Sequence, residues 1–220
     1  MNKKKIAILG ATGYIGKSIA EQFFLQGDDY QVFLFSRKKQ TLLYAFAAIE
    51  TSGSQSAFCT LDEFSLHRYD VIINCTGIGD PKELKRNPVS IFSVTEEMDT
   101  LVFSYLEKYP DTTYINISSG AVYGSDFSKA ISEETAPTFS LDASTPYDFY
   151  SIAKFYQEIK HRAYKELNIM DIRVFAFFSH FVDKSAAFLL SEMEWAFFQV
   201  QLKARCDKAL QWRATLEQVV

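Results

Sequence analysis

The stretch Lys5-Ile-Ala-Ile-Leu-Gly10-Ala-Thr-Gly13-Tyr-Ile-Gly16 joins a short apolar run to three glycines in the spacing G-x-x-G-x-x-G. The apolar run predicts a buried strand, and the glycines come directly before a helical pattern. Glycine lets the backbone turn tightly and approach a pyrophosphate, whose charge the amides and the positive end of the helix then stabilise. The stretch therefore predicts a nucleotide-binding turn, in which the contact residues would be Gly10, Thr12, Gly13, Tyr14, Ile15 and Gly16. A tight turn that binds no ligand is the alternative.

Beyond this turn, short apolar runs alternate with longer helical patterns, which is typical of βαβ units and a parallel sheet. The predicted strands are Lys5 to Leu9, Gln31 to Phe35, Ala57 to Cys59, Val71 to Asn74, Thr113 to Ile117 and Asp171 to Phe177. The predicted helices are Tyr14 to Gln26, Gln40 to Ile49, Ser90 to Tyr109 and Tyr150 to Leu167. This order predicts an α/β fold with a six-stranded, doubly wound parallel sheet of the Rossmann type.

Glycine and proline are distributed unevenly along the chain. All nine glycines lie between Gly10 and Gly124, and the last proline is Pro146. The end of the chain therefore predicts a short helical tail, with helices at Ser185 to Leu202 and Ala204 to Val219. We expect a nucleotide-binding domain with the catalytic helix over residues 1–180 and this tail over 181–220. The residues from Ser125 to Phe149 are expected to form a long loop.

Composition excludes several classes of protein. Hydrophobic residues make up 48% of the 220 residues and charged residues 23%, which is typical of a globular protein rather than a disordered one. A net charge of -4 argues against a nucleic-acid partner. No apolar stretch is long enough for a membrane span, and the cysteines form no CxxC pair, so we expect a cytoplasmic protein without disulfides or zinc. No metal site is expected either, because the three histidines are scattered and are interpreted as surface or packing residues: His67, His161 and His180.

The end of the second predicted strand bears on the choice between NAD and NADP. A carboxylate there commonly binds the ribose 2′-hydroxyl of NAD, whereas an arginine can accommodate the 2′-phosphate of NADP. The strand runs into Ser36-Arg37-Lys38-Lys39 and offers no carboxylate. Arg37 with Ser36 therefore favours NADP over NAD, with a solvated basic loop as the alternative. Asp62 is a candidate for the adenine amino group, or else the N-cap of the following turn.

A serine, a tyrosine and a lysine follow in an order that suggests redox chemistry. Ser118 and Ser119 end the fifth predicted strand, and Tyr150 and Lys154 share one helix face because they are four residues apart. An ammonium near a tyrosine favours the phenolate, which makes the tyrosine a better base. Alone, such a tyrosine–lysine pair is weak evidence; after a glycine turn and a serine at a strand end it is a strong signal.

Taken together, these motifs resemble the short-chain dehydrogenase/reductase superfamily, in particular its extended branch of NAD(P)-dependent sugar epimerases and dehydratases. The stretches that carry the resemblance are Gly10-Ala-Thr-Gly13-Tyr-Ile-Gly16, Asn74-Cys-Thr-Gly77, Ser118-Ser119-Gly-Ala-Val-Tyr123-Gly124, Glu133-Glu-Thr-Ala-Pro137 and Tyr150-Ser-Ile-Ala-Lys154. It implies that Ser119 is the catalytic hydroxyl, that Tyr150 is the acid/base, and that Lys154 binds the nicotinamide ribose and lowers the tyrosine pKa. It also implies that Cys75, Thr76 and Gly77 line the cofactor. Glu158 resembles a glutamate that is common in the family later in the helix of Tyr150 and Lys154.

Two departures from this pattern concern the substrate. The family usually has an R-x-x-N-x-Y-G-P-like run after the sixth strand, and here Ala176 and Ser179 stand at the asparagine and glycine positions. The substrate lobe that follows is short, so the resemblance implies a shortened or truncated member, or a pocket that a partner completes. Aromatic residues in the tail would cover a partner subunit, as in a homodimer, or an open pocket, or else pack in the core.

The sequence therefore predicts an NAD(P)-dependent oxidoreductase of the epimerase/dehydratase type that acts on a sugar, most simply a nucleotide-sugar. In this reading Tyr150 removes a hydroxyl proton while hydride passes to the nicotinamide. Two alternatives stay open: a cofactor-binding protein without turnover, such as a redox sensor or assembly subunit, and an inactive truncated member of the family.

Overall fold

The computed structural model describes residues 3–26, 29–47, 49, 55–78, 81–124, 131–132, 134–140, 142 and 145–181. The chain divides into two units, Met1–Phe178 and Ser179–Val220, and every described helix and strand belongs to the first. The two tail helices predicted at Ser185 to Leu202 and Ala204 to Val219 lie outside the described residues.

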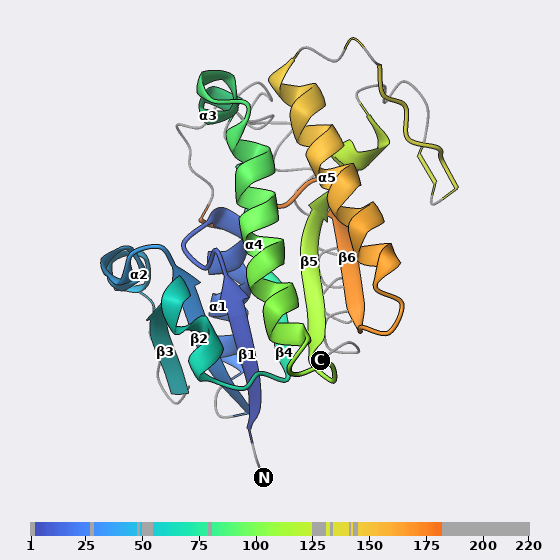
Figure 1. The fold of residues 1–220 in the computed structure, drawn as a ribbon. Coiled ribbons are helices and arrows are strands. Elements are labelled where there is room, and N and C mark those ends of the chain that lie inside the picture. The colour runs from blue at the N-terminus through green and yellow to red at the C-terminus, as the bar shows by residue number, and fades with distance from the viewer. Residues whose placement is uncertain are drawn as a thin grey trace. The chain divides into compact units, whose positions relative to one another are not determined.

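Six parallel strands form one sheet in the order β3-β2-β1-β4-β5-β6 (Figure 1). This is the doubly wound order that the alternating pattern predicts, so the predicted fold class is confirmed. β1 lies at the centre and pairs with β2 on one side and β4 on the other. The strand bounds are β1 Lys4–Leu9, β2 Tyr30–Ser36, β3 Gln55–Thr60, β4 Val71–Asn74, β5 Thr113–Ser119 and β6 Ile169–Val174.

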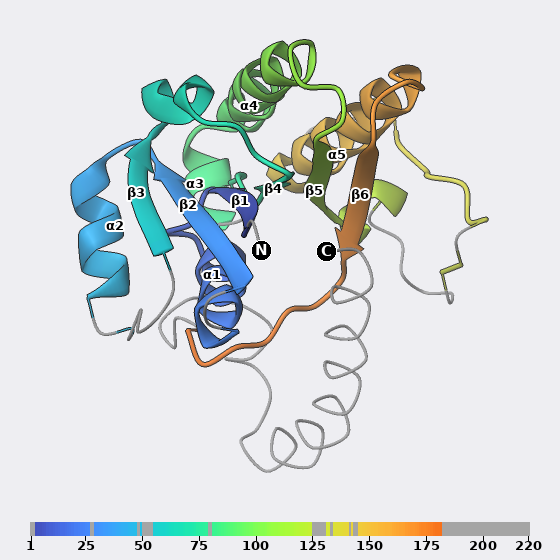
Figure 2. The same cartoon turned by 90° about the horizontal axis from the view of Figure 1, so that it is seen from below.

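Helices cover both faces of the sheet, with α4 and α5 side by side on one face and α1 on the other (Figure 2). The right-handed crossovers of parallel strands require this division, because the chain winds outward from β1 in two directions. The helical bounds are α1 Tyr14–Leu25, α2 Lys39–Phe46, η2 Leu61–Leu66, α3 Pro81–Arg86, α4 Ser90–Leu106, η3 Gly120–Tyr123 and α5 Pro146–Ala163, where η marks a 3-10 helix.

Several predicted boundaries are wrong by three or four residues. α2, α4 and α5 end at Phe46, Leu106 and Ala163 rather than at Ile49, Tyr109 and Leu167. α5 begins at Pro146 rather than Tyr150, because the Thr145 hydroxyl accepts a hydrogen bond from the Asp148 amide and the Asp148 carboxylate accepts one from the Thr145 amide. The predicted loop from Ser125 therefore ends before Phe149. β6 ends at Val174 rather than Phe177, where its pairing with β5 stops at Ser119.

The interior contains two kinds of packing. An aromatic core lies against the β2 and β3 side of the sheet, where the rings meet mostly at steep or tilted angles, and it consists of Phe33, Phe35, Phe64, Tyr69 and Tyr105. A polar core lies between α4, α5, β5 and β6, and it consists of Asp99, Lys154, Gln157, Glu158, His161, Asp171 and Arg173. Among the described residues, no helix is long and apolar enough to cross a membrane.

Candidate active site

The glycine turn after β1 requires glycine at two positions, because neighbouring backbone atoms leave no room for a Cβ. Gly10 has φ +70°, and a Cβ on it would lie 3.0 Å from the carbonyl carbon of Cys75 and from the amide nitrogen of Thr76. A Cβ on Gly16 would collide with the carbonyl oxygen of Gly10. Only glycine allows β1, the start of α1 and the chain after β4 to approach this closely. The structure therefore shows the tight strand-to-helix turn that the sequence predicts, and its binding of a pyrophosphate stays a prediction.

The start of α1 suits a bound phosphate. Gly13 is the N-cap and offers no side-chain oxygen to the first-turn amides, and the first turn contains no acidic residue. The Gly13 amide donates to the Gly10 carbonyl (3.0 Å), which fixes the turn. Amide groups and the positive helix end stabilise an anion at such a position. Tyr14 at the same turn donates its hydroxyl to the Phe177 carbonyl (3.3 Å) and packs edge-on against the Phe177 ring.

The residues predicted for the adenosine end lie at the ends of β2 and β3. Ser36 is buried, and its hydroxyl donates to the Lys38 carbonyl (2.7 Å), whereas Arg37 is exposed. Asp62 is exposed in the first turn of η2, so the alternative that it is the N-cap is wrong: that residue is Thr60. Glu63 bonds the Thr60 amide at 2.7 Å. The roles of Ser36, Arg37 and Asp62 toward a cofactor stay predictions.

The chain leaving β4 runs beside the glycine turn. The Cys75 amide donates to the Leu9 carbonyl (3.0 Å), and the Thr76 amide and hydroxyl both donate to the Asn74 Oδ1 (3.0 and 2.5 Å). A Cβ on Gly77 would lie 3.8 Å from the Lys154 Nζ. Desolvation raises the pKa of the half-buried Cys75 thiol to about 12, which favours its protonated form. The three residues predicted to line the cofactor therefore border both the glycine turn and Lys154.

Ser119 and Tyr150 meet at the carboxyl edge of the sheet. Burial raises the pKa of Tyr150, and a hydrogen bond with Ser119 partly opposes that rise. The Ser119 hydroxyl also accepts a hydrogen bond from the Ala121 amide (3.1 Å), which orients it at the end of β5. The lower tyrosine pKa that the resemblance implies is not found in the chain alone. In this state Tyr150 is a phenol, which can donate a proton to a substrate oxygen.

Lys154 is buried on the same face of α5 and is held by neutral groups. Its ammonium donates to the Ile117 carbonyl (3.2 Å) and to the Gln157 Oε1 (3.4 Å). Burial lowers the pKa of Lys154, since a charged group loses hydration in the interior. The structure therefore brings together all three residues that the sequence predicts to be catalytic, at the edge where Gly77 also lies.

Glu158 of α5 forms hydrogen bonds with residues of β5 and β6. It accepts a hydrogen bond from the Ser118 hydroxyl (2.6 Å) and from the Arg173 Nε and Nη2 (3.0 and 2.6 Å to Oε2). The Arg173 Nη1 donates to the Tyr123 hydroxyl (2.6 Å) beyond Ser119. The resemblance singled out Glu158, and the structure supplies a reason for a carboxylate there: it neutralises a guanidinium in the interior.

The sequence analysis did not identify four further members of the polar core as site residues. His161 was interpreted as a surface or packing histidine, and it is buried between two carboxylates, with Asp99 at 3.2 Å and Asp171 at 2.7 Å. Gln157 donates to the same Asp99 oxygen (2.9 Å). The signal in the sequence was the spacing. Gln157 and His161 follow Lys154 by three and seven residues, so on a helix they share the face that Lys154 occupies.

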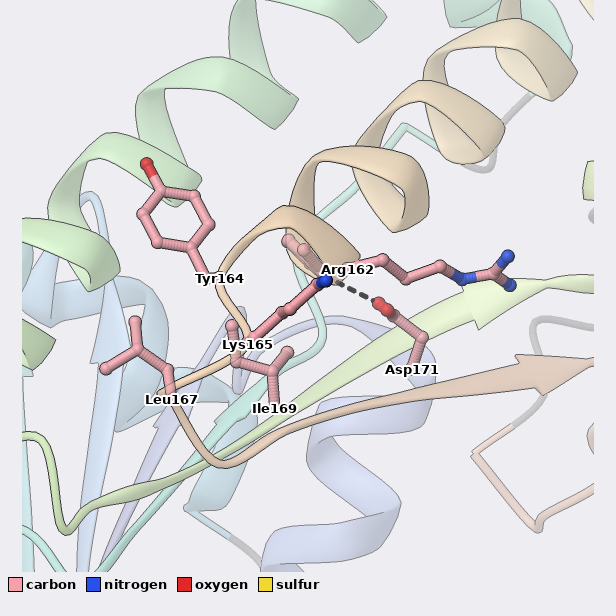
Figure 3. Close-up of a pocket in the computed structure, with 7 residues that line it drawn as sticks. Arg162, Tyr164, Lys165, Leu167, Ile169 and Asp171 are labelled. Carbon is pink, nitrogen blue, oxygen red and sulfur yellow. Dashed lines mark hydrogen bonds and ion pairs between the residues drawn. The ribbon is translucent and has the colours of Figure 1, made fainter.

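A cavity of about 210 Å³ lies at the other end of this helix, against the start of β6 (Figure 3). Its lining residues are His161, Arg162, Tyr164, Lys165, Leu167, Ile169 and Asp171, of which His161 and Asp171 contact each other through Nδ1 and Oδ1 (2.7 Å). Because β6 begins at Ile169, this cavity lies at the amino edge of the sheet, away from the glycine turn. Within the described part of the chain, no three His, Cys, Asp or Glu residues are arranged to hold a metal ion.

Comparison with known proteins identifies one family. The model of the NAD dependent epimerase/dehydratase family matches residues 6–190. Similar solved structures include the UDP-Glc/GlcNAc 4-epimerase from the human pathogen Campylobacter jejuni, with 20% identity and a TM-score of 0.60 over 77% of this chain and 53% of that chain. The PbgP3 protein from Burkholderia pseudomallei has 20% identity and a TM-score of 0.64 over 84% of this chain and 62% of that chain.

A third similar structure is the UDP-N-acetylglucosamine 4-epimerase from Methanobrevibacter ruminantium M1 in complex with UDP-N-acetylmuramic acid. It has 18% identity and a TM-score of 0.64 over 86% of this chain and 60% of that chain. At these identities the likeness establishes a shared fold. The chain spans between about half and three fifths of the length of the three proteins.

Proposed function

The chain belongs to the NAD-dependent epimerase/dehydratase family, and from this premise we propose that it binds a nicotinamide dinucleotide and transfers hydride to or from a hydroxyl-bearing sugar, of the nucleotide-linked class. The observation that carries the proposal is the meeting of Ser119 and Tyr150 beside a buried Lys154, at the sheet edge formed by the glycine turn and Gly77. Several of the similar structures are named as UDP-sugar epimerases, which favours the same substrate class.

The described residues fit a dinucleotide, because Gly10 and Gly16 allow the tight turn from β1 into α1, and no side-chain cap or acidic residue occupies the first turn of α1. In the proposal, the pyrophosphate contacts are Gly10, Thr12, Gly13, Tyr14, Ile15 and Gly16, and the later lining is Cys75, Thr76 and Gly77. When bound, the nicotinamide supplies the hydride acceptor or donor. Lys154 donates to the adjacent ribose with the one hydrogen that its bonds to Ile117 and Gln157 leave free.

Proton transfer belongs to the chain's own residues in this proposal. Ser119 hydrogen-bonds the reacting oxygen and holds it against the Tyr150 hydroxyl, which exchanges the proton with that oxygen. Burial raises the pKa of Tyr150 in the chain alone, so the tyrosine keeps its proton until positive charge arrives nearby. The positive charge of an oxidised nicotinamide would shift the tyrosine toward the phenolate and make it a base.

We favour NADP over NAD for this chain. β2 ends at Ser36 without a carboxylate, and the exposed Arg37 follows it. An arginine can bind the 2′-phosphate through two parallel hydrogen bonds. Ser36 is proposed as a neighbouring donor, which requires its hydroxyl to turn from the Lys38 carbonyl to the phosphate, and Asp62 is proposed to bind the adenine amino group. Dissociation constants for NADP and NAD, measured by titration, test the preference: tighter binding of NADP supports it, and equal or weaker binding contradicts it.

The first prediction removes the Tyr150 hydroxyl. Tyr150→Phe should reduce turnover of UDP-sugars by at least about 100-fold, because a positioned acid/base commonly contributes that much, while cofactor affinity stays unchanged. The measurement follows reduced-nicotinamide absorbance and product formation with a panel of UDP-sugars.

Near-normal turnover by the variant would contradict the role of Tyr150. Cofactor binding by the wild-type protein without turnover of any sugar would instead support a cofactor-binding protein that does no chemistry.

A further inference from the structure

The inward face of α5 is polar, which is unusual for a helix that packs against a sheet. Lys154, Gln157 and His161 are 3%, 1% and 3% exposed, whereas the large apolar side chains Tyr156 and Ile159 of the same helix are 49% and 44% exposed. Burying a charge or an amide is costly unless each polar atom finds a partner. The partners of these three side chains therefore explain why they face inward.

A continuous series of hydrogen bonds starts at the Lys154 ammonium. It donates to the Gln157 Oε1 (3.4 Å), and the Gln157 Nε2 donates to the Asp99 Oδ1 of α4 (2.9 Å). The His161 Nε2 contacts the same oxygen (3.2 Å), and its Nδ1 contacts the Asp171 Oδ1 of β6 (2.7 Å). The series thus joins α4, α5 and β6 to the one ammonium that lies beside Gly77.

Charge sets the direction of these hydrogen bonds. An ionised carboxylate only accepts, so Asp99 requires the Gln157 amide to turn its NH₂ group toward Asp99 and its oxygen toward Lys154. His161 must in turn be protonated on both nitrogens to bond two carboxylates. Burial opposes that charge, but hydrogen bonds with Asp171 and Asp99 raise the pKa of His161 to about 9. Asp99 therefore orients the acceptor that Lys154 uses.

The same carboxylates favour the charged form of Lys154. Burial is the largest influence and lowers the pKa of Lys154, and Asp99 and Asp171 are the next largest and raise it. The groups that face His161 from neighbouring elements are Asp99 of α4, Asp171 of β6 and the ring of Tyr114 of β5, with Lys160 bonded to Asp99 and Glu96 at the rim.

We propose that Gln157, Asp99, His161 and Asp171 form a positioning network that holds the Lys154 ammonium, oriented and charged, at the cofactor site. This inference rests on the proposed function for the role of Lys154 toward the cofactor, but the hold on the ammonium is a property of the chain alone. None of the four residues touches a reacting atom, so each acts through Lys154.

The test uses two variants and one matched control on the full chain. Asp99→Asn keeps the side-chain shape but adds an NH₂ donor, which can turn the Gln157 amide around and present its NH₂ group to Lys154. Gln157→Met removes the link and leaves Asp99 and His161 in place. Glu96→Gln removes one negative charge a turn earlier on α4, where the side chain pairs with Lys160 at the rim and touches neither Gln157 nor His161.

The first measurement follows the Lys154 side chain by NMR in selectively labelled, cofactor-free protein, with the signal assigned by its loss in Lys154→Met. The titration midpoint should fall in Asp99→Asn and stay at the wild-type value in Glu96→Gln. The second measurement is the NADP dissociation constant at neutral pH and near pH 9. It should rise by about tenfold in Asp99→Asn and Gln157→Met, as expected when a hydrogen bond to a charged group is lost, and rise further at the higher pH in Asp99→Asn.

An unchanged Lys154 midpoint in folded Asp99→Asn would overturn the inference, as would wild-type cofactor affinity in Gln157→Met. If Asp99→Asn does not fold, Gln157→Met decides the matter. A wild-type protein that binds neither dinucleotide would reject the proposed function, and the Lys154 titration would still decide the positioning network.

Discussion

The aromatic core and the polar core lie on the same face of one sheet, towards its β3 edge and its β6 edge, and they stabilise it with different forces. Apolar side chains such as Phe64 attract through many weak, non-directional contacts, whereas Glu158 and His161 contribute through a few short, directional bonds between charges. A ring can shift slightly and keep most of its contacts. A buried charge that loses its partner keeps its full desolvation cost. A substitution that keeps the shape of a side chain should therefore be tolerated in the aromatic core but not in the polar core, where it removes a charge.

Glu158→Gln should give the largest effect on stability. The substitution keeps the shape but leaves the Arg173 guanidinium without its counter-charge, which costs about 3 kcal/mol for a buried pair. Chemical denaturation measures the free energy of unfolding. Glu83→Gln is the control, because Glu83 pairs with Arg86 at the surface and should cost less than about 0.5 kcal/mol. Equal losses in the two variants would refute the comparison.

A rise in pH should weaken the polar core next. His161 has a raised pKa of about 9, so its contribution to stability is complete below its unfolded value of about 6.5 and is lost as the pH rises through 9. We expect the unfolding free energy to fall over that window by on the order of 3 kcal/mol. His161→Gln should flatten the dependence. A wild-type stability that is constant between these pH values would show that His161 is neutral in the folded protein.

Phe64→Leu tests the tolerance of the aromatic core. Phe64 is fully buried against Phe35, Tyr69 and Tyr105, and an apolar replacement of similar size should cost less than about 1.5 kcal/mol. Thermal and chemical unfolding measure the change. A loss as large as that of Glu158→Gln would mean that shape matters equally in both cores.

Thr145→Ala should give the smallest of these effects, about 1 kcal/mol, because it removes the N-cap of α5 at an exposed position. Thr145→Ser keeps the hydroxyl and serves as the control. The measured free energy of unfolding should therefore separate the two variants. Identical stabilities would indicate that the helix start depends on the polar core alone.

Most of the fold followed from local sequence pattern. Strand β4 was predicted at its observed bounds because a short apolar run between polar residues has few other interpretations. The start of α5 was missed although Thr145-Pro146-x-Asp148 is a capping pattern, since the helix was placed from the later tyrosine and lysine. β6 was extended too far because its apolar residues continue past the end of its pairing partner.

The sequence predicted only those members of the candidate site that belong to short motifs. Ser119, Tyr150 and Lys154 belong to short, ordered stretches, so their meeting could be expected. Asp99 and Asp171 come from distant parts of the chain. Asp99 has the spacing of the buried residues Thr95 and Phe103 of α4, but the sequence does not show which residue would pair with a carboxylate there. Their pairing with Gln157 and His161 depends on how α4 and β6 pack against α5, which no local periodicity encodes.

The central place of β1 also determines the order in which the sheet can be completed. β1, β2 and β3 can pair as soon as they leave the ribosome, but the second edge of β1 waits for β4, and the Lys5 amide bonds an Asp70 oxygen 65 residues later. Until then the edge of an apolar strand is open to other chains, which invites aggregation. We therefore expect this long-range closure to slow the folding of the sheet.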